Sequence, residues 1–178
     1  TYCGDLVTKY DGEYPIWVFV EIIPFGRLIK FYRFVANKLQ DRKMIDESYM
    51  LMDVRELRNA CAHNNCIIND LKANTSKYTA SYRVLNEVAK TGISKKVRDN
   101  KLSNTRIKQI VTLLYLNKNI VTSEGILKYQ TQILHELKDR IEHHIDYYNT
   151  NQLVQTNLNF LNKIIDKWYN CLLYTSDA

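Results

Sequence analysis

Glycine and proline are scarce in this chain, with 5 and 2 occurrences in 178 residues. Sandwiches and barrels use these residues at their many turns, so their scarcity favours helices. Hydrophobic residues make up 46% of the sequence, and in most of it they recur at helical spacing. The sequence therefore predicts an all-α fold with a folded core.

The apolar residues predict a series of helices separated by loops. Their approximate ranges are 14–23, 27–40, 46–64, 78–90, 104–114, 123–145 and 153–168. Residues 14–23 are rich in β-branched side chains and could form a strand, but a buried helix fits the helical surroundings better. Asp46 or Ser48 is expected to cap the helix that stops at Asn64-Asn65, and Ser103 or Asn104 a later helix.

Charge and hydropathy limit the classes of protein that need to be considered. No apolar run reaches the roughly 18 to 20 residues of a membrane span, and no signal peptide is recognisable, so we expect a cytoplasmic protein. The formal net charge of +6 suits a nucleic-acid partner. The chain is also rich in Lys, Asn, Ile and Tyr, which AT-rich codons encode, so the positive charge can result from codon composition alone.

Cysteine and histidine give little support for a disulfide framework or a metal site. With Cys171 set aside as part of the C-terminal tail discussed below, Cys3, Cys61 and Cys66 form an odd set without paired spacing. Together with His63 the last two could bind zinc, but no fourth ligand follows, and Cys61 falls on an apolar stripe that predicts a buried free cysteine. Neighbouring helical residues point about 100° apart, so His143-His144 is expected at the surface or in packing rather than on one metal ion. We expect neither a metal nor a cofactor.

Both ends of the sequence are expected to differ from those of the natural protein. The chain begins with Thr1 rather than Met, which suggests a fragment. Residues 171–178 (CLLYTSDA) resemble a translated sequencing adapter and are excluded from the fold prediction, the alternative being an ordinary polar tail.

The segment with the clearest chemistry is MLMDVRELRNACAHNN, residues 50–65. Arg55, Asn59 and His63 are spaced four apart, so a helix places them near one face, with Arg58 one position further round. Arginine binds phosphate oxygens in a bidentate manner, and histidine transfers protons near neutral pH. This set suits a phosphodiester, the alternative being arginines in surface ion pairs beside an ordinary helix end.

The order of several short motifs resembles the Abi-like (abortive infection) family. The motifs are Pro15-Ile16-Trp17, Glu21, Phe25-Gly26 and LRNACAHNN at residues 57–65, matching the family pattern Pro-x-Trp, Glu, Phe-Gly and Leu-Arg-Asn-x-x-Ala-His. Arg-Asn-x-x-x-His is also the signature of the wider HEPN superfamily. The resemblance covers about residues 10–70, and the later helices carry no motif that matches.

The resemblance implies an all-α, HEPN-type helical bundle that is incomplete at its N-terminus and has additional C-terminal helices. The expected division is a core at residues 1–75, which carries the motif, and an additional helical region at residues 76–170. The substantial segment that precedes Pro-x-Trp in the family is absent here. Part of the bundle and of the dimer surface would therefore be missing.

The resemblance also implies a metal-independent endoribonuclease in phage defence, as an abortive-infection or toxin–antitoxin effector. His63 would be the general acid or base, Arg58 would stabilise a phosphorane-like transition state, and Asn59 would orient the pair. The expected partners are RNA, a second copy in a homodimer with a composite active site, and an antitoxin. The alternatives are a non-catalytic HEPN module that binds RNA or a partner, and a purely structural scaffold.

Other residues are candidates for supporting roles. Glu21 lies on a mostly apolar helix, so it could hydrogen-bond Arg58 or simply face solvent. Arg55 shares the helical face of the motif. A candidate RNA-binding phosphate track, whose alternative is a solvated basic surface, consists of Lys95, Lys96, Arg98, Lys101, Arg106 and Lys108.

Overall fold

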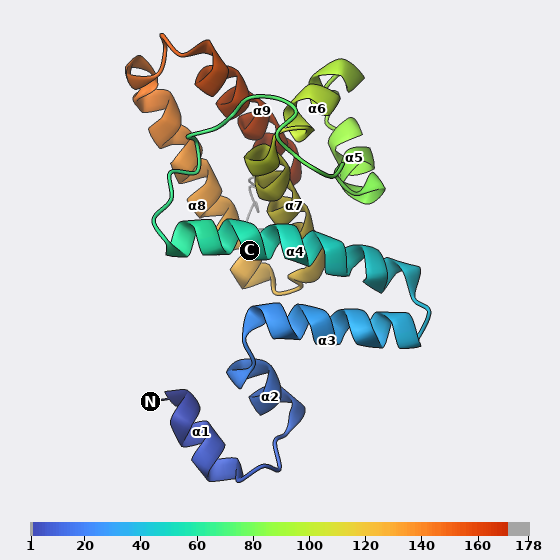
Figure 1. Cartoon of the computed structure of the whole chain (residues 1–178). Coiled ribbons are helices and arrows are strands. Elements are labelled where there is room, and N and C mark those ends of the chain that lie inside the picture. The colour runs from blue at the N-terminus through green and yellow to red at the C-terminus, as the bar shows by residue number, and fades with distance from the viewer. Residues whose placement is uncertain (1, 171–178) are drawn as a thin grey trace, which may run out of the picture. The chain divides into compact units, whose positions relative to one another are not determined.

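The computed structural model describes residues 2–170, and this part of the chain contains helices but no strand. The helices are α1 (Tyr2–Tyr10), α2 (Ile16–Ile22), α3 (Phe25–Lys38), α4 (Arg42–Ala62), α5 (Tyr82–Ala89), α6 (Lys95–Leu102), α7 (Thr105–Ile120), α8 (Glu124–His143), the short 3₁₀ helix η1 (Ile145–Tyr147) and α9 (Gln152–Trp168) (Figure 1). The predicted all-α fold is confirmed. The prediction for residues 171–178 lies outside the described residues.

The chain divides into two compact units, Thr1–Arg55 and Glu56–Ala178, with the boundary inside α4. The expected division after residue 75 stays a prediction. The last turns of α4 group with the later helices, because Glu56 of α4 is hydrogen-bonded to Gln109 of α7.

Residues 16–22 in the first unit form a helix and not a strand, as the helical surroundings predicted. The prediction that this helix is buried is wrong. Val18 is fully buried, but Ile16 and Trp17 are 68% and 54% exposed. The helix contacts α1, and its Phe19 packs edge-on against Phe31 of α3, with ring centroids 5.5 Å apart. These contacts cover only part of an element that is apolar nearly all round.

Helix α4 begins earlier than predicted, because its N-cap is Asp41 rather than Asp46 or Ser48. The Oδ1 atom of Asp41 accepts a 3.0 Å hydrogen bond from the N–H of Met44, three residues on, as an N-cap side chain does. Ser48 lies inside the helix and is fully buried, and its hydroxyl donates to the carbonyl oxygen of Ile45.

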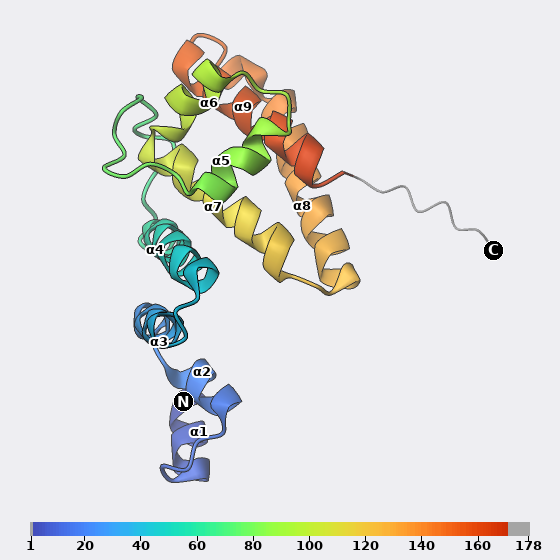
Figure 2. The same cartoon turned by 90° about the vertical axis from the view of Figure 1, so that its right-hand side faces the viewer.

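The core of the second unit is built around α7. This helix contacts α5, α6 and α9, and α8 contacts α9 (Figure 2). The buried aliphatic side chains include Val84 and Val88 of α5, Ile107, Val111 and Leu114 of α7, and Ile164 and Ile165 of α9. Burial of each such side chain contributes about 1.5–3 kcal/mol, so α7 supports the elements around it.

Two elements of the second unit differ from the prediction. Residues 95–102, in a segment expected to be basic and weakly periodic, form α6. Helix α8 has the predicted apolar stripe, but none of its residues is buried, and Ile126 and Leu137 remain 51% and 47% exposed. Periodicity indicates which side of a helix is apolar, whereas packing decides how much of that side is covered.

Tyr169, directly after α9, joins three helices of the second unit. Its hydroxyl lies 2.8 Å from the carbonyl oxygen of Leu114 and 2.9 Å from Oδ1 of Asn117, both on α7. Its own carbonyl oxygen lies 2.7 Å from Nε2 of His135 on α8. Burial raises the pKa of the Tyr169 hydroxyl well above its usual range, so this group stays protonated in the folded state.

Replacing Tyr169 by phenylalanine is expected to lower the free energy of unfolding by about 1–2 kcal/mol near neutral pH, because the carbonyl of Leu114 loses a buried partner. Below about pH 10 the hydroxyl is protonated in both states, so its stabilisation is complete; above that pH it ionises first in the unfolded chain, and stability falls. Urea denaturation near pH 8 and near pH 10.5 measures the free energy of unfolding at each pH. Between these two values it should fall less for Tyr169→Phe than for the wild type. The exposed Tyr147→Phe variant should behave as the wild type.

Candidate functional site

The end of α4 positions the predicted catalytic histidine. The helix stops one residue before His63, and Asn64 adopts a left-handed conformation with a φ of 53°. The N–H of Asn64 donates to the carbonyl oxygen of Cys61 at 3.0 Å, and that of Asn65 to Ala60 at 2.9 Å, which is the hydrogen-bond pattern of a Schellman motif. Asparagine adopts this conformation more readily than most residues. The predicted stop is confirmed, and it places His63 at the C-cap.

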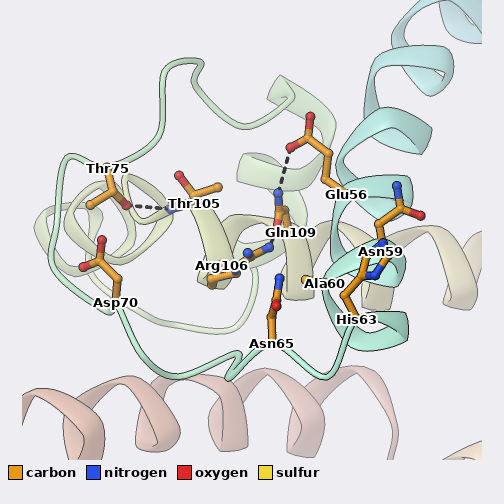
Figure 3. Close-up of a pocket in the computed structure, with 10 residues that line it drawn as sticks. All are labelled: Glu56, Asn59, Ala60, His63, Asn65, Asp70, Thr75, Thr105, Arg106 and Gln109. Carbon is orange, nitrogen blue, oxygen red and sulfur yellow. Dashed lines mark hydrogen bonds between the residues drawn. The ribbon is translucent and has the colours of Figure 1, made fainter.

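A pocket of about 540 Å³ opens beside this helix end (Figure 3). Its walls come from the end of α4, the loop that follows, and the start of α7. The lining residues are Glu56, Asn59, Ala60 and His63, then Asn65, Asp70 and Thr75, then Thr105, Arg106 and Gln109. Asn59 and His63, two of the three predicted catalytic residues, therefore line the same pocket in the second unit.

Arg58 lies beside this pocket and is not one of its lining residues. Its side chain is exposed, and Nη1 donates a 3.0 Å hydrogen bond to Oδ1 of Asn59. Asn59 thus connects Arg58 to the pocket wall. A direct approach of Arg58 to a ligand held by His63 stays a prediction.

The pocket contains hydrogen bonds that the sequence analysis did not anticipate. Nη1 of Arg106 donates to Oε1 of Gln109 at 2.9 Å, and Nε2 of Gln109 donates to Oε2 of Glu56 at 3.0 Å (Figure 3). Gln109 is 1% exposed, which is unusual for a glutamine. The one available sequence signal was the three-residue spacing of Arg106 and Gln109 on a predicted helix.

Asn104 anchors the loop that forms one wall of the pocket. Its Oδ1 accepts a 2.9 Å hydrogen bond from the N–H of Ile107, so it caps α7, as one of the two predicted cap residues. Its Nδ2 donates to the carbonyl oxygens of Asp70 at 2.9 Å and Lys72 at 2.8 Å. The side chain is 1% exposed, so these bonds are shielded from water.

Two predicted supporting residues belong to the first unit. A β-carbon placed on Gly26 would lie 3.4 Å from Cδ and Nη1 of Arg55, so the glycine provides close access for this arginine. Arg55 does not line the pocket that contains His63. Glu21 is exposed, and its predicted hydrogen bond to Arg58 would join the two units, so it stays a prediction.

Lys108 is a correction to the predicted phosphate track. It is 5% exposed, and its Nζ lies 3.4 Å from the carbonyl oxygen of Tyr78. Helix α7 is covered on several sides, so this lysine, the last of the predicted track, is enclosed by protein. It therefore cannot belong to an exposed RNA-binding surface.

The other five cations of the predicted track occupy different surroundings. Arg98 donates to a backbone carbonyl just before α6, and Lys101 donates a 2.8 Å hydrogen bond to a threonine of α9 at a separate pocket. Arg106 lines the pocket of His63, and Lys95 and Lys96 are exposed. A phosphate track formed by these five cations stays a prediction.

The cysteines Cys3, Cys61 and Cys66 are free, as predicted. The prediction that Cys61 is buried is wrong, because it lies in the final turn of α4, beyond the buried Leu57. Within residues 2–170 no group of three or more His, Cys, Asp or Glu side chains is placed to hold a metal ion.

His143 and His144 lie closer together than the sequence predicted. Their ring centroids are 4.9 Å apart and nearly perpendicular, because α8 ends at His143 and the chain turns there. The ring of His144 stacks on Tyr147 with centroids 4.9 Å apart. This packing role agrees with the interpretation favoured from the sequence.

The structure thus shows a helical protein with a polar pocket that carries histidine, asparagine and arginine. The model of one family, described as Abi-like protein, matches residues 2–69. No curated protein and no solved structure gave a significant match to the chain. The matched segment includes Asn59 and His63, whereas Arg106 and Gln109 lie beyond it. Residues 2–170 include no helix with the length and hydropathy of a membrane-spanning segment.

Proposed function

We propose that this chain belongs to a cytoplasmic effector of phage defence, of the abortive-infection type, and that it cleaves RNA. The observation that carries the proposal is that His63 and Asn59 line one pocket together with Arg106. The similarity of residues 2–69 to the Abi-like family supports the defence role. A proton-transfer group beside a guanidinium group is a suitable set for phosphodiester cleavage.

In the proposed reaction His63 accepts the proton of a ribose 2′-hydroxyl, and the 2′-oxygen forms a bond to the adjacent phosphorus. The bond between phosphorus and the 5′-oxygen breaks, and that oxygen takes up a proton. The products are a 2′,3′-cyclic phosphate and a 5′-hydroxyl. Arg58 stabilises the charge of the phosphorane-like transition state, and Asn59, which accepts its hydrogen bond, orients it.

RNA and DNA oligonucleotides of the same sequence test this proposal. We expect the chain to cleave the RNA in the presence of EDTA and to leave the DNA intact, because DNA lacks the 2′-hydroxyl. Mass spectrometry should detect cyclic phosphate ends. Three results would each contradict the proposed mechanism: intact RNA, cleavage of both the RNA and the DNA oligonucleotide, or cleavage of RNA that needs added Mg²⁺.

The proposal includes a homodimer with a composite active site and neutralisation by an antitoxin, as the resemblance implies. The exposed position of Arg58 supports the dimer, because this guanidinium is accessible to a second copy. Sedimentation at several protein concentrations, combined with activity measurements, tests this. A monomer that is fully active at every concentration would rule out the composite site.

The position of Arg58 outside the pocket lining favours one second candidate, a module that binds RNA or another protein without cleaving it. Binding needs the pocket and the surrounding cations but no proton transfer. In that case the wild type would release no cyclic phosphate, and His63→Ala would bind RNA as tightly as the wild type.

A further inference from the structure

We infer that Arg106 forms a phosphate-binding subsite in the pocket of His63, with Gln109 and Glu56 holding its guanidinium in place. The ligand of this subsite is a backbone phosphate of single-stranded RNA. The inference rests on the proposed function and assigns a specific role and ligand to a residue from outside the segment that matches the Abi-like family.

The two groups that would act on one RNA strand come from different parts of the chain. His63 follows α4, and Arg106 lies in the first turn of α7, yet both line the same pocket (Figure 3). His63 is exposed and Arg106 is partly buried, so one is open to solvent while the other is held by its surroundings.

The orientation of the Arg106 side chain follows from the chemistry of Gln109. The glutamine oxygen accepts from Nη1 of Arg106, and its nitrogen donates to the carboxylate of Glu56. A flipped amide would set its N–H groups against the guanidinium and its oxygen against the carboxylate, and both contacts would be repulsive. The buried amide therefore has one favourable orientation, which fixes the direction of Arg106.

In the same arrangement no direct ion pair within the described residues neutralises the positive charge of Arg106, so this charge is available to a ligand. The amide of Gln109 lies between Arg106 and Glu56, so the hydrogen bonds that connect them include no direct ion pair. A guanidinium has five N–H donors, and the bond to Gln109 uses the Nη1 side of the group. The remaining donors form a fork of the kind that binds two oxygens of one phosphate.

The negative groups of the pocket restrict where a phosphate can lie. Asp70 projects from the loop wall, and Glu56 from α4 (Figure 3). Carboxylates repel a phosphate, so these two walls are unfavourable positions for it. The favourable position is on the Arg106 side of the pocket, which His63 also lines.

Binding of a 2′-O-methyl RNA oligonucleotide, which cannot undergo the proposed cleavage, tests Arg106 independently of catalysis. Fluorescence anisotropy over a salt series should show Arg106→Gln binding about tenfold more weakly than the wild type at low salt. The slope of log affinity against log salt should become shallower by about 0.7, the value for one lost phosphate contact on a single strand. Arg140→Gln, an exposed arginine of α8 outside the pocket, is the matched control and should change neither quantity.

Arg106→Lys separates the contribution of the positive charge from that of the bidentate guanidinium geometry. It also takes the place of Arg106→Gln in the binding test if that variant does not fold. Lysine keeps one positive charge, so the salt slope should stay near that of the wild type. The loss of bidentate geometry should still weaken binding severalfold. A lysine variant with wild-type affinity at every salt concentration would overturn the inference.

The outcomes separate this inference from the proposed function. A wild type that cleaves RNA while Arg106→Gln keeps the wild-type salt slope would overturn the inference and leave the proposed function standing. A wild type that cleaves nothing, but whose RNA binding depends on Arg106 as described, would overturn the proposed function and leave the inference standing. A wild type that binds no RNA at any salt concentration would overturn both.

Discussion

Replacing His63 by alanine is expected to lower the rate of RNA cleavage by at least about 100-fold, because a general acid or base contributes about 10²- to 10⁴-fold. The expected effect on folding is small. The side chain is exposed, and the hydrogen bond of His63 to the carbonyl oxygen of Asn59 uses the backbone N–H, which alanine retains. The melting temperature should therefore stay close to that of the wild type.

His143→Ala is the matched control, because this exposed histidine also lies at the end of a helix but outside the pocket. Single-turnover rates on a fluorescent RNA, with melting curves of each variant, make the comparison. A His63→Ala variant that cleaves within a few-fold of the wild type would remove the catalytic role. If His63→Ala instead has a much lower melting temperature and the wild type has no activity, the results would support the alternative of a purely structural scaffold.

Replacing Asn104 by alanine is expected to lower the free energy of unfolding by about 2–4 kcal/mol. The loss of the N-cap of α7 accounts for about 1 kcal/mol, and the carbonyl oxygens of Asp70 and Lys72 each lose a shielded donor, at about 1 kcal/mol or more. RNA cleavage should fall as well, because the loop from residue 65 to residue 78 forms one wall of the pocket. Urea denaturation and cleavage rates measure the two effects.

Asn151→Ala provides the comparison, because Asn151 is an exposed N-cap of α9 that accepts one 3.1 Å hydrogen bond from Val154. Its loss should cost about 1 kcal/mol and leave RNA cleavage unchanged. Asn104→Ser separates the two roles of Asn104, since serine can still cap α7 but cannot reach the loop carbonyls. Equal stability losses for Asn104→Ala and Asn151→Ala would show that the loop anchor contributes nothing.

The part of the candidate site that could be predicted from the sequence is the part that lies on one helix. The motif indicated Asn59 and His63, and Asn64-Asn65 indicated where the helix ends; the structure has that end at the pocket. The hydrogen bonds of Arg106, Gln109 and Glu56 could not be predicted in this way. Glu56 and Gln109 are 53 residues apart, and no local pattern shows that the end of α4 lies against the start of α7.

The sequence by itself determined the features that depend on residues within about one helical turn of each other. These are the helical class, the end of α4 at its asparagines, and the start of α7 after a cap at Ser103 or Asn104. Helix periodicity and capping involve only such neighbours, so both leave a signal in the sequence, although the cap of α4 is Asp41 and not one of the two predicted residues.

Only the tertiary structure decided which apolar and charged faces are covered. It enclosed Lys108, left Cys61 and the stripe of α8 exposed, and brought Arg106 into the pocket of His63. Burial depends on which helices pack together, and that choice is the sum of many weak contacts between distant residues. The residues on a single helical face do not indicate which helix will pack against it.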